Sequence, residues 1–160
     1  QAFYKEIGFD PDLVEGVVYS PRFRFAGQLD LEFPLSVVQA EKLKPYLMRS
    51  SETPQEGRVI TDFKTGSFYQ KPHGMQIAAY RQAYEETYNN PVTGGLVVNI
   101  KREDPEKVQC FYYSKDTLEE AFNEGFLSAK KAWEFLGAPA WYRKEMGKEI
   151  KDGNGNDQAD

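Results

Sequence analysis

The sequence of 160 residues is poor in the side chains that build covalent links and soft-metal sites, because it holds one cysteine, Cys110, and one histidine, His73. A single cysteine excludes a disulfide within the chain, a zinc site built from cysteines and an iron–sulfur cluster held by this chain alone. Long apolar runs are missing too, since no stretch approaches the roughly 18 residues that a membrane-spanning helix needs. The first residues do not show the pattern of a signal peptide, so we expect none. We therefore expect a soluble protein of a reducing compartment.

A surplus of positive charge is also missing. The 25 Asp and Glu outnumber the 20 Lys and Arg and give a net charge of −5. This balance argues against a protein that coats nucleic acid through bulk positive charge. It is compatible with a site that holds a phosphodiester through divalent cations, because such a site is built from carboxylates.

Five stretches are typical of strands and two of long helices. Strands are predicted over 13–19, 22–33, 58–65, 94–100 and 108–113. Helices are predicted over about 72–88 and 116–136, with a short helix broken at Pro45 within 35–57. This order indicates an α/β or α+β fold, a sheet of about five strands with helices packed on it. We expect one domain over residues 1–151 and a disordered tail over 152–160, where large apolar side chains are missing.

The stretch 22–33 shows the clearest alternation in the chain. Its polar residues, with Asp30 among them, fall on one face of an extended strand. The other face carries Phe23, Phe25, Leu29, Leu31 and Phe33. We expect this apolar set to pack as one face and Pro34 to end the strand.

Carboxylates, a lysine and two polar helix residues follow one another in order along the chain. Asp30 lies on the polar face of the second strand. Asp62 and Lys64 share one face of the third strand, because side chains two residues apart point the same way. Gln76 and Tyr80, four residues apart, share one side of the helix that follows. If the second and third strands pair, Asp30 and Asp62 can lie close together at one rim of the sheet.

Two carboxylates at close quarters repel each other unless a cation compensates them. Mg²⁺ or Mn²⁺ is the natural cation, because hard divalent ions take oxygen ligands from carboxylates, water and phosphate. The backbone carbonyl of Phe63 is a further candidate ligand, and Glu15 on the first strand is another carboxylate that can point toward the site. Such a metal lowers the pKa of a bound water and neutralises charge on a phosphoryl transition state. Lys64 would then orient the attacking water or stabilise the developing charge.

The ordered set G-x-x-D, D-x-K and Q-x-x-x-Y resembles the RecB-like branch of the PD-(D/E)xK nuclease superfamily. In this sequence it reads Gly27…Asp30, Asp62-Phe63-Lys64 and Gln76…Tyr80. The resemblance spans roughly residues 13 to 136 in element order. It implies a restriction-endonuclease-like fold, a mixed sheet flanked by helices. It also implies Mg²⁺- or Mn²⁺-dependent hydrolysis of phosphodiesters, with metal bound by Asp30 and Asp62 and Lys64 as the catalytic lysine.

The function that the resemblance implies is that of a deoxyribonuclease, an exonuclease rather than an endonuclease, in recombination, repair or phage DNA processing. The partner would be DNA, as linear duplex or single strand, and a homo-oligomer or a larger recombination complex is open. Gln76 and Tyr80 would contact DNA or support the metal ligands, and His73 lies where it can reach a DNA phosphate. Such nucleases act in the cytoplasm of a bacterial or phage-infected cell, with an organelle matrix as the alternative. Family members usually begin with a helix, and many carry a catalytic His or Glu on it, so we expect that helix to be truncated here.

Plainer explanations exist for each of these residues. Asp30 and Glu15 can be solvated acids on exposed sheet faces. Asp62 and Lys64 can form a surface ion pair worth well under ~1 kcal/mol. His73 can be a loop or capping residue. Gln76 and Tyr80, for their part, can be a polar helix edge and a core tyrosine.

Two other functions also remain open at this point. One is a nucleic-acid-binding or assembly module that keeps the fold with weak turnover or none. The other is an unrelated α/β domain with a chance motif match, which a large separation of Asp30 and Asp62 would favour.

Overall fold

A computed structural model describes residues 2–137 of the chain. Five strands form one sheet in the order β1-β2-β3-β4-β5, and all neighbours are antiparallel except β3 and β4, which run parallel. The strands are β1 (Leu13–Ser20), β2 (Phe25–Leu35), β3 (Gly57–Lys64), β4 (Gly94–Ile100) and β5 (Val108–Ser114). A mixed sheet of five strands with flanking helices confirms the expected α+β class.

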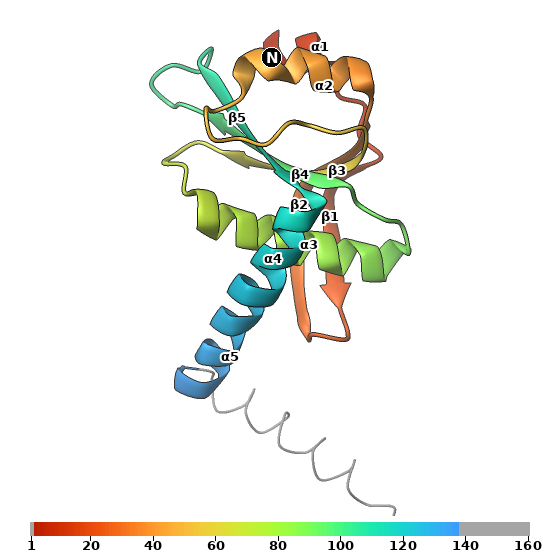
Figure 1. Cartoon of the computed structure of the whole chain (residues 1–160), viewed down its shortest axis with the longest axis vertical. Coiled ribbons are helices and arrows are strands. Elements are labelled where there is room, and N and C mark those ends of the chain that lie inside the picture. The colour runs from red at the N-terminus through yellow and green to blue at the C-terminus, as the bar shows by residue number, and fades with distance from the viewer. Residues whose placement is uncertain (1, 138–160) are drawn as a thin grey trace, which may run out of the picture. The chain divides into compact units, whose positions relative to one another are not determined.

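Helices cover both faces of the sheet (Figure 1). α1 (Ala2–Ile7) and α2 (Val37–Leu43) lie on one face. α3 (Gln70–Tyr88) crosses the opposite face, where α4 (Lys115–Glu120) and a π-helix (Ala121–Phe126) pack against it. Because α3 is the crossover between the parallel strands β3 and β4, the carboxyl ends of these two strands meet at the same edge of the sheet.

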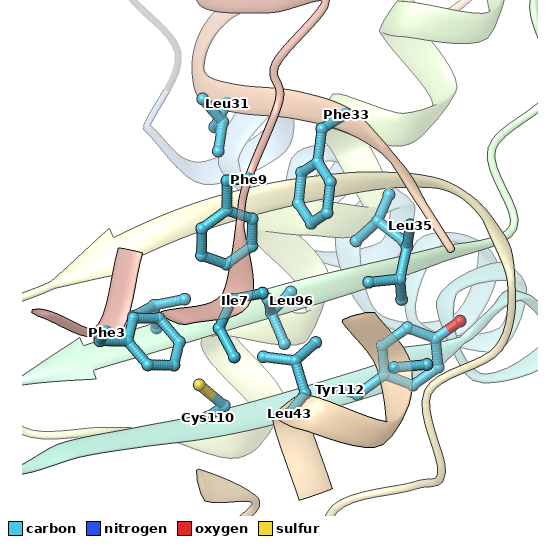
Figure 2. Close-up of a cluster of buried hydrophobic side chains, with 13 residues drawn as sticks. Phe3, Ile7, Phe9, Leu31, Phe33, Leu35, Leu43, Leu96, Cys110 and Tyr112 are labelled. Carbon is cyan, nitrogen blue, oxygen red and sulfur yellow. The ribbon is translucent and has the colours of Figure 1, made fainter. Parts of the chain in front are cut away.

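The main apolar cluster fills the space between the sheet and the helices α1 and α2 (Figure 2). Alternate residues of β2, Leu31 and Phe33, point into it and meet Phe9 from the segment after α1. Fully burying such a side chain contributes about 1.5–3 kcal/mol. Since a shift of one residue would turn these side chains out of the cluster, their burial fixes the register of β2. Glu32, between them, therefore faces α3.

The helix α1 lies ahead of the first expected strand and was not predicted from the sequence. It contributes Phe3 and Ile7 to the apolar cluster (Figure 2). Its Glu6 accepts a hydrogen bond from the hydroxyl of Tyr46 at 2.5 Å, within the 3-10 helix Lys44–Tyr46 that follows α2. Glu6 thus ties α1 to the segment after α2.

The prediction that Pro34 ends the second strand is wrong. β2 continues to Leu35, and Pro34 pairs with Arg58 of β3. The ladder with β1 has already ended at Glu32, so β2 is an edge on that side at Pro34. A proline is tolerated there because no strand needs its missing N–H.

The apolar residues of the stretch 22–33 alternate as predicted, but they do not pack as one face. Leu31 lies in the cluster beneath α1 and α2, whereas the ring of Phe25 lies 4.8 Å from that of Phe126 in the π-helix. The change coincides with Asp30 and Glu15, which the β1–β2 ladder skips. Glu15 has a φ of 49°, a left-handed backbone that is uncommon outside glycine. β2 therefore changes its packing partners at Asp30.

The helix expected over 116–136 is present as an unbroken helical run from Lys115 to Leu136, but it is not α-helical throughout. The chain forms α4, then the π-helix, and then α5 (Leu127–Leu136), which belongs to a second compact unit that begins at Leu127. A π-helix widens the turn, and apolar spacings of three and four residues do not report that change. The end of the expected domain at residue 151 and the expected tail over 152–160 lie outside the described residues. Between residues 2 and 137, no helix is both long and apolar enough to cross a membrane.

Candidate active site

Asp30 and Asp62 stand opposite each other where β2 and β3 separate. The last pair of the β2–β3 ladder joins Leu31 to Thr61, so these two acids are the next residues along the two strands. Beyond that pair, Oδ2 of Asp30 accepts a hydrogen bond from the backbone N–H of Phe63 at 2.8 Å. The carboxylate of Asp30 thus replaces a ladder bond. The two acids lie near each other, as expected for paired strands, and the large separation that would favour a chance match is not found.

Asp62 is a buried carboxylate whose partner is the ammonium of Lys64. Its side chain is 5% exposed, and Nζ of Lys64 lies 2.7 Å from its Oδ2. This ion pair is the contact that Oδ2 makes within the described residues, and the buried oxygen accepts no further hydrogen bond there. Burial raises the pKa of Asp62, the ammonium of Lys64 opposes that shift, and the charge of Asp30 adds to it. A cation between the two acids would relieve both costs.

Lys64 is held by a chain of contacts that runs back to the glycine of the first motif. Its Nζ donates to Oε1 of Gln76 at 3.0 Å, and Nε2 of Gln76 donates to the hydroxyl of Tyr80 at 3.0 Å. The ring of Tyr80 lies against the backbone of Gly27, where an added Cβ would stand 2.5 Å from Cε1. The three motifs are therefore one connected structure. Gln76 contacts Lys64 directly, and Tyr80 contacts Gln76.

The residues present fit a divalent cation that takes only a few of its ligands from the protein. Among residues 2–137, no three side chains of His, Cys, Asp or Glu gather in a way that could hold a metal ion. Mg²⁺ commonly takes only one or two protein carboxylates and completes its shell with water and phosphate oxygens. Asp30 and Asp62 match that donor set, and the buried Oδ2 of Asp62 has an unused lone pair. In an extended strand the C=O of a residue points to the same side as its N–H, so the carbonyl of Phe63 also faces Asp30.

Glu15 does not join this group. Its side chain is exposed and makes no ion pair or hydrogen bond within the described part of the chain. Only its backbone carbonyl is engaged, by Nε2 of Gln28 at 3.2 Å. The left-handed backbone of Glu15 marks the bend of the β1–β2 hairpin beside Asp30.

His73 lies in the first turn of α3 and has a structural partner. Its Nδ1 accepts a hydrogen bond from the backbone N–H of Tyr69, the residue before the helix, at 3.3 Å. Burial, and then the charge of Lys64, lower the pKa of His73. A neutral ring that accepts at Nδ1 carries its proton on Nε2. His73 thus caps α3, and its Nε2–H is a donor near Lys64.

Asn99 is a residue of this region that the sequence analysis missed. It lies beside Lys64 in the parallel β3–β4 ladder, on the same face as Asp62, and it is 1% exposed. Its Oδ1 is buried without a hydrogen-bond partner. A signal was present, because Asn99 is the one polar side chain in the apolar run 94–100. It could be used only once β4 was known to run parallel to β3.

No protein-family model matches this chain, and a search of curated proteins found no relative. The resemblance to the RecB-like nucleases therefore rests on the motif residues alone. In the structure these residues are two neighbouring carboxylates, a lysine paired with Asp62, and a glutamine and a tyrosine that follow the lysine in a chain of hydrogen bonds.

Proposed function

We propose that this protein is a Mg²⁺- or Mn²⁺-dependent deoxyribonuclease, and that it acts as an exonuclease. One observation carries the proposal: Asp30 and Asp62 lie side by side beyond the end of the β2–β3 ladder, with the ammonium of Lys64 2.7 Å from Asp62. A structural ion pair needs one acid and one base. A second acid beside a buried one raises the cost of both charges, which is an arrangement typical of functional sites.

Asp30, Asp62 and the carbonyl of Phe63 are the residues that would hold the cation. When bound, a divalent cation lowers the pKa of a water molecule and neutralises charge on the phosphate. Lys64 carries the positive charge of the protein itself, and its ammonium would stabilise the charge that develops on the phosphoryl oxygens. Gln76 holds that ammonium through Oε1, which limits its positions to those near Asp62.

Residues around the start of α3 supply candidate contacts to a DNA strand. Tyr69 is 60% exposed, and its ring lies 6.0 Å from that of His73. Lys71 is exposed in the first turn of the helix. Exposed aromatic rings stack on bases, and lysines contact phosphates without reading sequence. With the Nε2–H of His73, these groups would hold a strand end beside Lys64.

Incubation with end-labelled linear DNA tests the proposal. Duplex and single-stranded substrates are each incubated with Mg²⁺, with Mn²⁺ and with EDTA. We expect metal-dependent loss of label with the parent protein and none with Asp62→Asn, which keeps the shape of the side chain. Asp104→Asn is the matched control, because it removes the same charge from an exposed turn. A circular substrate then separates exonuclease from endonuclease activity.

Binding without cleavage would select the alternative function. If the parent shifts labelled DNA in a gel but releases no label in either metal, the protein is a binding or assembly module. Equal cleavage by the parent and Asp62→Asn would show that Asp62 is not a residue of the active site.

A further inference from the structure

Asn99 presents a buried hydrogen-bond acceptor that nothing satisfies. The residue is 1% exposed, and its Oδ1 has no donor within the described structure. Buried polar atoms are nearly always paired, and an unpaired one costs stability. Such an atom at the edge of a candidate active site indicates a partner that the present arrangement of side chains does not supply.

The ammonium of Lys64 is a donor on the adjacent strand. Asn99 and Lys64 are partners in the parallel β3–β4 ladder, so their side chains leave the same face of the sheet on adjacent strands. Neighbouring strands lie only about 4.8 Å apart, well within the reach of a lysine side chain. The ammonium has three donors, and its contacts are Asp62 and Gln76. One N–H of Lys64 thus remains for an acceptor such as Oδ1 of Asn99.

A cation on Asp62 would force the ammonium of Lys64 to move. At present Nζ lies 2.7 Å from Oδ2 of Asp62, the oxygen that is otherwise without a donor. Two positive charges cannot share that oxygen at such a distance without strong repulsion. The ammonium can keep its bond to Gln76 and turn toward a neutral acceptor. Asn99 is the buried neutral acceptor on the adjacent strand.

We propose that Asn99 is a positioning residue that accepts a hydrogen bond from the ammonium of Lys64 when a divalent cation binds Asp62. This inference rests on the proposed function. Lys64 then has two positions, one on Asp62 without the cation and one between Gln76 and Asn99 with it. The unpaired Oδ1 of Asn99 is the acceptor of the second position.

A double-mutant cycle of Asn99→Leu and Lys64→Met tests this inference. The Mn²⁺ affinity of each full-chain variant is measured by isothermal titration calorimetry. Asn99→Leu keeps the side-chain volume but removes the acceptor, so the ammonium stays on Asp62 and opposes the cation. We expect Mn²⁺ to bind about tenfold more weakly, the size of effect that residues behind metal ligands have. In Lys64→Met no ammonium has to move, so adding Asn99→Leu should leave the affinity unchanged. This dependence on Lys64 is a result that a merely structural asparagine would not give.

Thr61→Val is the matched control. Oγ1 of Thr61 is also buried without a partner, but Thr61 is next to Asp62 in sequence and so points to the opposite face of β3. Its removal should leave Mn²⁺ affinity unchanged. If Asn99→Leu does not fold, Asn99→Ser removes the amide with a smaller side chain and takes its place in the cycle.

Three results would overturn the inference. Unchanged affinity in Asn99→Leu would show that Lys64 needs no second acceptor, while the proposed function would stand. The same loss in the presence and absence of Lys64 would show that Asn99 acts on the cation or on the fold directly. A parent protein that binds no Mn²⁺ would remove both the inference and the metal-dependent function.

Discussion

The backbone of Gly27 lies against the ring of Tyr80 so closely that a Cβ on Gly27 would stand 2.5 Å from Cε1. The hydroxyl of the same ring accepts a hydrogen bond from Gln76, and Gln76 in turn accepts one from Lys64. A glycine on β2 therefore sets the position of a lysine on β3 through two side chains of α3.

Gly27→Ala should move the ring of Tyr80 and with it the support of Lys64. Overpacking of this kind costs about 1–3 kcal/mol of the free energy of unfolding. We also expect slower DNA cleavage, because Gln76 would lose the position from which it holds the lysine. Urea denaturation and the cleavage assay measure the two effects.

Gly66→Ala is the control for that variant. Gly66 lies in the turn after β3, where an added Cβ meets no heavy atom within 4 Å. Its stability should stay the same or rise by about 0.4–1 kcal/mol, because alanine restricts the unfolded chain. If both alanine variants behave like the parent, the contact between Gly27 and Tyr80 is not a constraint on the site.

Gln76→Leu should lower turnover more than substrate affinity. Leucine fills the space of glutamine but cannot accept a hydrogen bond from Lys64, so the ammonium loses its fixed position near Asp62. We expect kcat to fall by about tenfold or more, as for residues that support a metal site, with KM changed little. Gln82→Leu on the same helix is the control, because Gln82 donates to Glu86 and not to the site. A change confined to KM would instead assign Gln76 to DNA binding.

The sequence predicted the five strands and the shared face of Asp62 and Lys64, because both follow from the two-residue repeat of an extended backbone. It also predicted that Asp30 and Asp62 would be neighbours if their strands paired, and the strands do pair. Those predictions needed only the alternation of side chains along a strand and the pairing of two neighbouring strands.

Features that depend on distant contacts were not predictable. β2 changes its packing partners at Asp30 because α1 and α2 cover one part of it and the π-helix another. The hold of Gln76 on Lys64 depends on how α3 crosses the sheet, which no local pattern reports. Asn99 could be assigned to the site only when β4 was known to run parallel to β3, which places it beside Lys64.

Tyr69→Ala should weaken the binding of single-stranded DNA. The ring is 60% exposed and lies beside His73 at the start of α3. Loss of one stacked base costs about 1–3 kcal/mol of binding free energy, which is roughly a fivefold to 150-fold rise in Kd. Fluorescence anisotropy with a labelled oligonucleotide and Asp62→Asn protein measures this without cleavage.

Tyr88→Ala is the matched control, since Tyr88 is 45% exposed at the other end of the same helix. Its Kd should equal that of the parent. Equal losses in both variants would point to a general effect of tyrosine on α3, and no loss in either would place the DNA strand elsewhere.

Arg58→Met tests the buried ion pair next to the site. Glu32 is fully buried beneath α3, where it pairs with Arg58 and accepts a hydrogen bond from the hydroxyl of Tyr84 at 3.1 Å. Removing the arginine leaves a buried carboxylate without its counter-charge, which costs about 3–5 kcal/mol of the free energy of unfolding. Arg102→Met, in an exposed turn, should cost little.

The loss in Arg58→Met should also depend on pH. Burial already raises the pKa of Glu32 above 4.5 in the parent, and Arg58 opposes that shift. The folded state therefore holds the proton of Glu32 more tightly than the unfolded state does. The stability from this group is full below pH 4.5 and is lost as the pH rises through the raised pKa. Without Arg58 that pKa rises further, so the variant should lie closest to the parent near pH 4.5 and furthest from it at pH 7. Urea denaturation in EDTA across this range measures the free energies of unfolding of parent and variant. If their difference does not change with pH, the pKa of Glu32 in the folded state does not depend on Arg58.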